Sequence, residues 1–203
     1  MISITHNLKE VAKRLKRIEK QIPFATRNAI NATAFDAQRE AKEAMPKFFD
    51  RPTPFTVKGV QVNKATKQNL KAEVVIPANR EYLGRQIKGG VLEPKKGKDL
   101  IFPGPAQSLN KYGNIPKNRY KTLRSKSNVF VGQPKGQTNR GFGVYQRTGK
   151  GGSKGLKKWI NFVPQAWYKP RFPFAQVVSK AINKYFDRNF TKAFQHATRT
   201  AKR

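Results

Sequence analysis

The sequence predicts an α+β fold with an N-terminal helical pair, an antiparallel β-sheet or small sandwich in the middle, and a long C-terminal helix. Three observations indicate it. Apolar residues recur at three- and four-residue spacing near both ends of the chain, as on one face of a helix. Short alternating segments bounded by turn residues fill the middle. With 203 residues, of which 37% are hydrophobic, the chain can bury a core, and we expect one domain overall.

The helical pair is expected over residues 5–22 and 23–45. The first helix has a basic face opposite an apolar stripe, which consists of Leu8, Val11, Leu15, Ile18 and Ile22. Pro23 suits the first turn of the second helix. One face of that helix carries mostly small residues, namely Ile30, Ala34, Ala37, Ala41 and Ala44. Phe24 and Phe35 lie on a different face and are candidate contacts to a neighbouring subunit.

The stretch "FFDRPTPFT" at 48–56 interrupts the helical region. A proline disfavours helix at the residue before it, so Arg51 and Thr53 are predicted to be extended. We interpret the segment as a stiff elbow that sends a helical arm, residues 1–47, towards a neighbour. The candidate interface residues of this elbow are Arg51, Pro52, Pro54 and Phe55.

A β-rich region is expected over residues 57–170. Its predicted strands share alternating apolar residues and adjacent turn signals, and they cover 57–65, 69–77, 98–104, 128–134, 142–148 and 156–164. A short helix ending at glycine is predicted over 80–90. The polar stretch 104–127 is too long for an ordinary connection and is interpreted as a long basic loop.

The C-terminal helix is expected within residues 171–203. Its apolar residues repeat every four residues instead of every 3.6, so the apolar stripe winds around the helix. A winding stripe cannot be buried against one flat partner. We therefore expect its first half to pack on the chain's own sheet and its second half, which includes Phe190 and Phe194, to contact other helices in this subunit or the next.

The net charge of +32 indicates a negatively charged partner, either nucleic acid or an acidic protein assembly. Residues 100–186 contain 17 Lys or Arg and no Asp or Glu, so ion pairs within that segment cannot neutralise it. The candidate contacts to phosphate or to an acidic partner are Lys117, Arg119, Lys121, Arg124, Arg147, Lys150, Lys154, Lys157 and Lys158.

Aromatic residues interleaved with these cations suit stacking on single-stranded nucleic acid. They are Tyr112, Tyr120, Phe142, Tyr145 and Trp159. Their strand-like context favours core packing instead. No helix-turn-helix, zinc-finger or RNP signature is present, so sequence-specific base reading has no visible motif.

The sequence offers no catalytic, cofactor or metal site. It has no Cys, and His6 and His196 lie near opposite ends without a cluster of further ligands. Asp36, Glu40 and Glu43 form the one dense acidic group. They suit either a Mg²⁺-dependent nuclease or ion pairing with Arg39, Lys42 or the basic first helix, and ion pairing is favoured.

Two further sequence signals bear on function class. The loop "GKGGSKG" at 149–155 lacks the spacing of a phosphate-binding P-loop and is interpreted as a basic hairpin loop. No window approaches the roughly 18 consecutive apolar residues of a membrane span, and the N-terminus lacks a signal-peptide pattern. We expect folding in a cytoplasm and no membrane partner.

Four segments resemble the minor tail protein Z family of long-tailed phages and prophages, also called tail-completion proteins. They are "ATRNAINATAFDAQREAKEAM" at 25–45, "FDRPTPFT" at 49–56 with "VNKATKQNLKAEVVI" at 62–76, "YLGRQIKGG" at 82–90, and "RFPFAQVVSKAI" continuing to "FTKAFQHATR" at 171–199. They stand in family order and comprise 82 of the 203 residues, and the first two are the most specific. The loop 104–127 matches no family segment.

The resemblance implies a non-enzymatic virion protein, made in the host cytoplasm, that forms a ring at the head-proximal end of the tail. Such a protein finishes the tail and helps join it to the head. The implied partners are further copies of the chain in a hexameric ring, the tail tube or tail terminator, head–tail connector proteins, and phage DNA contacted non-specifically. The alternatives are a non-specific nucleic-acid-binding protein of the packaging or chromatin-like kind and a metal-dependent nuclease.

Overall fold

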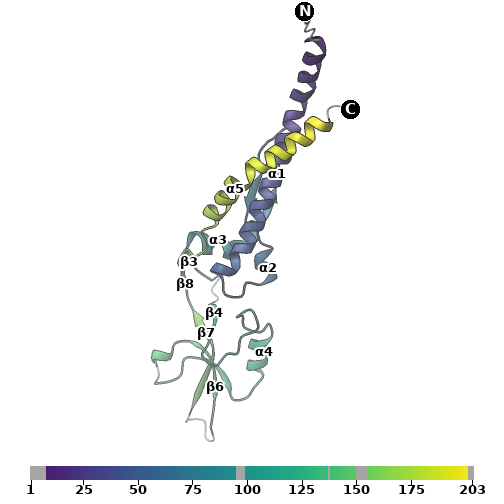
Figure 1. Cartoon of the computed structure of the whole chain (residues 1–203). Helices are drawn as coiled ribbons and strands as arrows, with labels where there is room; N and C mark the ends of the chain where they lie inside the picture. Colours follow the sequence, from purple (N-terminus) through teal and green to yellow (C-terminus); the bar gives the residue numbers. More distant parts are fainter. Residues whose placement is uncertain (1–7, 95–98, 137, 150–154, 201–203) are drawn as a thin grey trace, which may run out of the picture. The chain divides into compact units, whose positions relative to one another are not determined.

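The computed structural model describes residues 8–94, 99–136, 138–149 and 155–200. They form an α+β fold with a long N-terminal helix, antiparallel sheets and a long C-terminal helix, as predicted (Figure 1). The helices are α1 (Leu8–Phe48), α2 (Pro54–Val57), α3 (Glu81–Lys88), α4 (Arg119–Arg124) and α5 (Phe174–Thr200), with 3-10 turns η1 (Ala78–Arg80) and η2 (Thr138–Arg140). The strands are β1 (Gln61–Asn63), β2 (Glu73–Val75), β3 (Gly90–Leu92), β4 (Leu100–Pro103), β5 (Val129–Gly132), β6 (Gly143–Arg147), β7 (Leu156–Val163) and β8 (Ala166–Tyr168).

The chain divides into two compact units. Unit 1 comprises Met1–Met45, Pro54–Leu83 and Phe172–Arg203, and unit 2 comprises Pro46–Thr53 and Gly84–Arg171. This grouping differs from the predicted succession of arm, elbow, β-rich region (57–170) and C-terminal helix. Residues on both sides of the predicted elbow belong to unit 1, because β1 and β2 pack on the helix that precedes them.

The predicted N-terminal helical pair is one continuous helix, α1, of 41 residues. Pro23 lies in its interior instead of starting a second helix, and Pro46 lies in its last turn. A proline in a helix removes one backbone hydrogen bond and crowds the preceding turn. The residues before Pro23 are mostly strong helix formers, and those after it pack against other parts of unit 1, so the helix continues through the proline.

Helices α1 and α5 pack against each other in antiparallel directions. Asn189 of α5 meets Thr33 and Asp36 of α1, and Tyr185, one turn earlier in α5, meets Glu40, one turn later in α1. The small face predicted for α1 is largely confirmed, since Ala34, Ala37 and Ala41 are buried while Ile30 and Ala44 are half-buried. Small side chains allow a neighbouring element to approach α1 closely.

A second side of α1 supports the short antiparallel pair β1–β2. The side-chain amide of Asn31 donates to the carbonyl of Ala65 at 3.1 Å and accepts from its N–H at 2.7 Å. Gln38 donates to the carbonyl of Val60 at 2.7 Å. These strands are only three residues long, so the backbone groups of Val60 and Ala65 lie outside the strand pairing. Asn31 and Gln38 of α1 provide their hydrogen-bond partners instead.

Unit 2 is built on a four-stranded antiparallel sheet in the order β4-β7-β6-β5. Its core cluster is Leu123, Val144 and Ile160, against which Tyr120, Val129, Trp159 and Phe162 pack. The four predicted strands of this region are confirmed with shorter bounds. The predicted loop 104–127 contains α4, whose Leu123 is fully buried in this core.

Two local predictions are wrong. The first strand starts at Gln61 and not at residue 57, because Val57 ends the one-turn helix α2. Arg51 is not extended: its φ is 47°, in the left-handed region. Its guanidinium holds the neighbouring Asp50 in a bidentate ion pair at 2.9 and 2.7 Å.

Candidate interaction surfaces

Positive charge is concentrated in unit 2. Its sequence ranges hold 22 Lys or Arg against 3 Asp or Glu, whereas those of unit 1 hold 21 against 8. Among the described residues, none of the candidate cations between Lys117 and Lys158 has an ion pair with a carboxylate. The charge of this segment therefore faces solvent or a partner.

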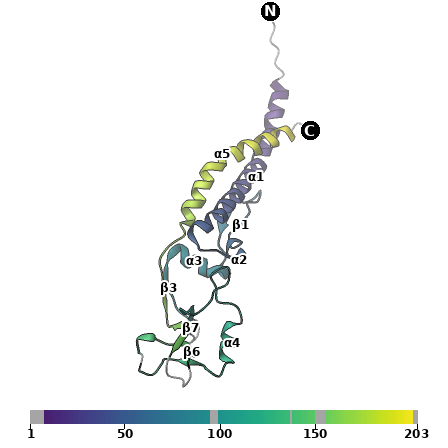
Figure 2. The ribbon, with the colours of Figure 1, turned by 60° about the horizontal axis from the view of Figure 1, so that its bottom comes forward.

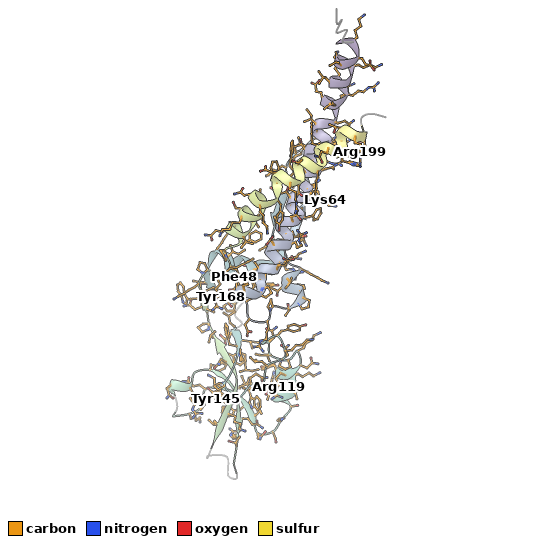
Figure 3. The ribbon with its side chains drawn as sticks, viewed as in Figure 1. Phe48, Lys64, Arg119, Tyr145, Tyr168 and Arg199 are labelled. Carbon is orange, nitrogen blue, oxygen red and sulfur yellow. The ribbon has the colours of Figure 1, made fainter. Side chains whose placement is uncertain are left out.

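The helix α4 and the residues just before it form what we call the α4 surface, made by Lys117, Arg119, Lys121 and Arg124. The guanidinium of Arg119 lies 4.3 Å from the ring centre of Trp159 and donates to Gln107 at 3.3 Å. The indole N–H of Trp159 donates in turn to Gln146 at 2.9 Å. Arg119 is thereby held in one orientation; Figure 3 shows its side chain in unit 2. Sequence reasoning missed Gln107 and Gln146, which carry no local signal.

Two shallow, open pockets adjoin α4. One of about 320 Å³ is lined by Gln107, Ser108, Pro116, Asn118, Arg119 and Thr122. The other, of about 450 Å³, is lined by Tyr120, Lys121, Arg124 and Ser125. Both are lined by hydroxyl and cationic groups and no carboxylate, and the first is also lined by the side-chain amides of Gln107 and Asn118.

The remaining candidate cations are distributed along β6 and β7. Arg147 lies 4.6 Å from the ring centre of Phe130, and Lys158 lies 5.3 Å from that of Tyr145 and donates to the carbonyl of Arg140. Lys157 is exposed. Lys150 and Lys154, with the basic loop around them, lie outside the described residues.

The interleaved aromatic residues serve mainly as core, as their strand-like context predicted. Tyr145 is fully buried, and its hydroxyl donates to backbone carbonyls at 2.7 and 2.9 Å. Trp159 and Tyr120 pack on the core cluster. Phe142 is 48% exposed but lies against Phe162 at 5.8 Å between ring centres. Cations cover several of these rings, which leaves little free face for stacking bases.

The interface candidates near α1 and α2 have neighbours inside unit 1. Phe24 is half-buried, with Arg27 and Lys67 at 5.0 and 5.8 Å from its ring centre. Phe35 is 42% exposed beneath Lys64. Phe55 is 58% exposed and stacks on the guanidinium of Arg80. In the predicted elbow, Arg51 and Pro54 are exposed and Pro52 is half-buried.

Helix α5 carries a ladder of stacked rings, which we call the α5 ladder: Phe186, Phe190 and Phe194. Successive ring centres are 5.9 and 6.3 Å apart. Phe186 and Phe194 are each 37% exposed. Phe190, between them, is half-buried. The contact of Phe190 and Phe194 with another helix stays a prediction, and Phe186 extends the ladder by one turn.

The N-terminal part of α1 exposes its apolar residues. Val11, Leu15 and Ile22 are 48%, 61% and 44% exposed, and Ile18 is half-buried. We call these four residues the α1 stripe. In Figures 1 and 2 this part of α1 runs beyond the end of α5, so α5 does not cover the stripe.

The acidic group of α1 is engaged in helix packing. Asp36 pairs with Arg39 at 2.5 Å and with Arg188 at 3.3 Å, as the ion-pair interpretation predicts for Arg39. Glu40 accepts from Lys184 at 3.1 Å and from the Tyr185 hydroxyl. The α5 partners were not predicted, because nothing local in the sequence marks them.

Both carboxyl groups have lowered pKa values. Partial burial alone would raise the pKa of Asp36, but the hydrogen bonds from Asn189 and Arg39 and the charges of Arg39 and Arg188 lower it overall. Hydrogen bonds from Tyr185 and Lys184 lower the pKa of Glu40. Within the described ranges, no group of His, Asp or Glu side chains is arranged to hold a metal ion; His196 is exposed, and His6 lies outside those ranges.

Among the described helices, none is both long enough and apolar enough to cross a membrane. Comparison with protein-family models, with curated proteins and with solved structures finds no match to this chain.

Proposed function

We propose that this chain is a structural virion protein, a tail-completion protein at the head-proximal end of a long phage tail. In this proposal it forms a ring, taken as a hexamer to match a tail tube. The ring finishes the tail and contacts the tail tube or terminator on one side and head–tail connector proteins on the other. The proposal combines the family resemblance of four segments, described above, with surfaces of unit 1 that suit assembly.

The single observation that carries the proposal is the exposed α1 stripe. Exposed apolar residues that line up along a helix are typical of interaction sites. Covering them removes apolar surface from water, which is worth about 25 cal/mol per Å². A helix with such a face gains stability when another helix covers it, and further copies of the chain are the partners that a ring requires.

The spacing of the α1 stripe supports pairing with a helix. Val11, Leu15, Ile18 and Ile22 are followed at the same alternating spacing by Ala25 and Ala29, which are buried in unit 1. This is the seven-residue pattern of helix pairs. The positions beside the stripe are Ala12, Arg14, Glu19 and Gln21, so one cation and one carboxylate flank it, whereas four lysines occupy the outer positions of this part of α1: Lys9, Lys13, Lys16 and Lys20. A neighbouring copy can therefore approach the stripe without meeting those lysines directly.

The assembly test compares two double variants of the full chain by sedimentation velocity. Leu15→Asn with Ile22→Asn alters the stripe, and Lys13→Asn with Lys20→Asn alters the outer face by the same number of exposed residues. We expect the purified protein and the lysine variant to sediment as the same oligomer and the stripe variant as a monomer. A stripe variant that assembles like the unaltered chain would exclude this surface from assembly.

The virion role is tested in a phage or prophage that encodes the chain. Deletion of its gene should leave heads and tails that fail to join stably, which electron microscopy of lysates would show. Normal infectious particles from the deletion strain would contradict the structural role.

A second candidate function is favoured by the charge of unit 2. A non-specific nucleic-acid-binding protein of the packaging or chromatin-like kind would use that excess of cations. It predicts salt-sensitive DNA binding by a chain that does not assemble, so the sedimentation experiment separates the two candidates. The nuclease alternative has less support, because Asp36 and Glu40 hold α5 against α1 through basic partners.

A further inference from the structure

The α4 surface is a region of unit 2 in which cations lack acidic neighbours. No Asp or Glu occurs between residues 100 and 186 of the sequence. In the described part of the chain, Lys117, Arg119, Lys121 and Arg124 have no ion pair. Like charges this close repel each other, so the arrangement is stabilised when an anion joins it.

Aromatic rings organise the two arginines. Arg119 is held by Trp159 and Gln107, and the guanidinium of Arg124 lies 5.8 Å from the ring centre of Tyr120. Stacking on a ring restrains the guanidinium plane and leaves its N–H edge available for hydrogen bonds. A guanidinium edge matches the geometry of phosphate oxygens.

The chemistry of the α4 surface favours phosphate over an acidic protein. Protein–protein interfaces place an apolar core inside a polar rim. The exposed residues of α4 are Lys121, Thr122 and Arg124, all polar, while its Leu123 is buried and Tyr120 packs edge-on against Phe162. Contacts to a nucleic-acid backbone are made by such cationic, hydroxyl and amide groups.

We propose that the α4 surface binds the phosphate backbone of nucleic acid through Lys117, Arg119, Lys121 and Arg124, with the two pockets beside α4 accommodating phosphate groups. This goes beyond the assembly role, which rests on unit 1. The rings of Trp159 and Tyr120 are covered by Arg119 and Arg124, so nucleic-acid bases do not stack on them. Binding is independent of base sequence and takes duplex DNA.

The experiment measures binding of a fluorescein-labelled 20-base-pair duplex to the full chain by anisotropy over a series of salt concentrations. The test variant is Lys121→Glu with Arg124→Glu, both exposed. The matched control is Lys180→Glu with Lys192→Glu, which reverses two exposed cations of α5 in unit 1 and changes the net charge equally. Circular dichroism and thermal unfolding establish that each variant is folded, and Lys121→Gln with Arg124→Gln replaces the test variant if charge reversal unfolds it.

The test variant should lose at least about tenfold in affinity at 0.1 M salt, and its slope of log K against log salt should fall by about 2. The control should keep the slope of the unaltered chain. Equal losses in both variants would show that net charge alone drives binding and would overturn the assignment to α4. A competition experiment distinguishes nucleic acid from acidic protein, with poly-glutamate of matched charge added to the complex of the chain with labelled duplex. If poly-glutamate displaces the labelled duplex as well as unlabelled duplex does, the surface recognises acidic protein and the nucleic-acid proposal is wrong. Sedimentation of the same variants reports on assembly separately, so a failure here leaves the assembly proposal standing.

Discussion

Asn189 of α5 donates its side-chain amide to the carboxylate of Asp36 of α1 at 2.8 Å, across 153 residues of sequence. The same amide lies 3.2 Å from the Thr33 hydroxyl. Both Asn189 and Asp36 are buried. Buried polar groups are stabilising only when their hydrogen bonds are satisfied, so this pair fixes how α5 lies along α1.

Replacing Asn189 with Ala should destabilise the protein by about 1–3 kcal/mol, because Asp36 loses its buried amide donor. The substitution improves helix propensity by about 0.5 kcal/mol, so propensity cannot cause the loss. Chemical denaturation followed by circular dichroism measures the change. Asn183→Ala, at an exposed position of α5, is the control and should be neutral or slightly stabilising. Equal effects at both positions would mean that the Asn189–Asp36 contact contributes nothing.

Stability should fall in acid because of Asp36 and Glu40. Their pKa values in the folded protein are below the ordinary values of 3.8 and 4.5. Above those values both carboxyls are ionised in the folded and unfolded chain, and their full contribution is present. As the pH falls below about 4.5, the unfolded chain takes up protons first, and stability declines towards the folded-state pKa values.

The unfolding free energy measured between pH 3 and pH 7 tests this dependence. The variant Asp36→Asn with Glu40→Gln should be less stable near neutral pH and should lose less stability on acidification. The exposed pairs Asp50–Arg51 and Lys71–Glu73 remain in the variant and supply the residual slope. Parallel pH profiles for the variant and the unaltered chain would assign the acid sensitivity to other carboxyls.

Two glycines should respond oppositely to alanine. A Cβ at Gly143 of β6 would overlap the backbone carbonyl oxygen of Ile160, whereas a Cβ at Gly84 of α3 meets nothing within 4 Å. Gly143→Ala should cost about 1–3 kcal/mol because the sheet must shift. Gly84→Ala should stabilise by about 0.5–1 kcal/mol through helix propensity. Thermal unfolding of the two variants checks both signs, and a tolerated Gly143→Ala would mean that β6 and β7 can separate at little cost.

Replacing Pro52 and Pro54 with Ala should leave the protein folded. Pro54 is the first residue of α2, a position that alanine also accepts. Each replacement enlarges the freedom of the unfolded chain and costs roughly 0.4–1 kcal/mol, which is small beside a typical stability of about 5–15 kcal/mol. Circular dichroism and chemical denaturation show whether the double variant is folded. Its incorporation into tails measures assembly, and we expect that incorporation to be impaired. Outright unfolding would show that this segment is essential to the core.

The sequence by itself determined the elements whose signals are local. Periodicity placed helix across both ends of the chain, and alternation placed the strands of the four-stranded sheet, because both patterns reflect which side of a single element is buried. The presence of Lys and Arg without any Asp or Glu in residues 100–186 is likewise a property of the sequence alone. It identified the cations of the α4 surface. The ion pair between Asp36 and Arg39, three residues apart, was predictable for the same reason.

Tertiary structure decided everything that depends on distant neighbours. The continuation of α1 through Pro23 and the burial of Leu123 on α4 both follow from contacts that local propensity does not encode. The strand β3 (Gly90–Leu92) is three residues long and pairs with β8, more than seventy positions later; a strand so short forms only when its partner is present. The engagement of Asp36 and Glu40 by α5, and the exposure of the α1 stripe beyond the end of α5, likewise arise because packing, rather than sequence period, selects which faces are covered.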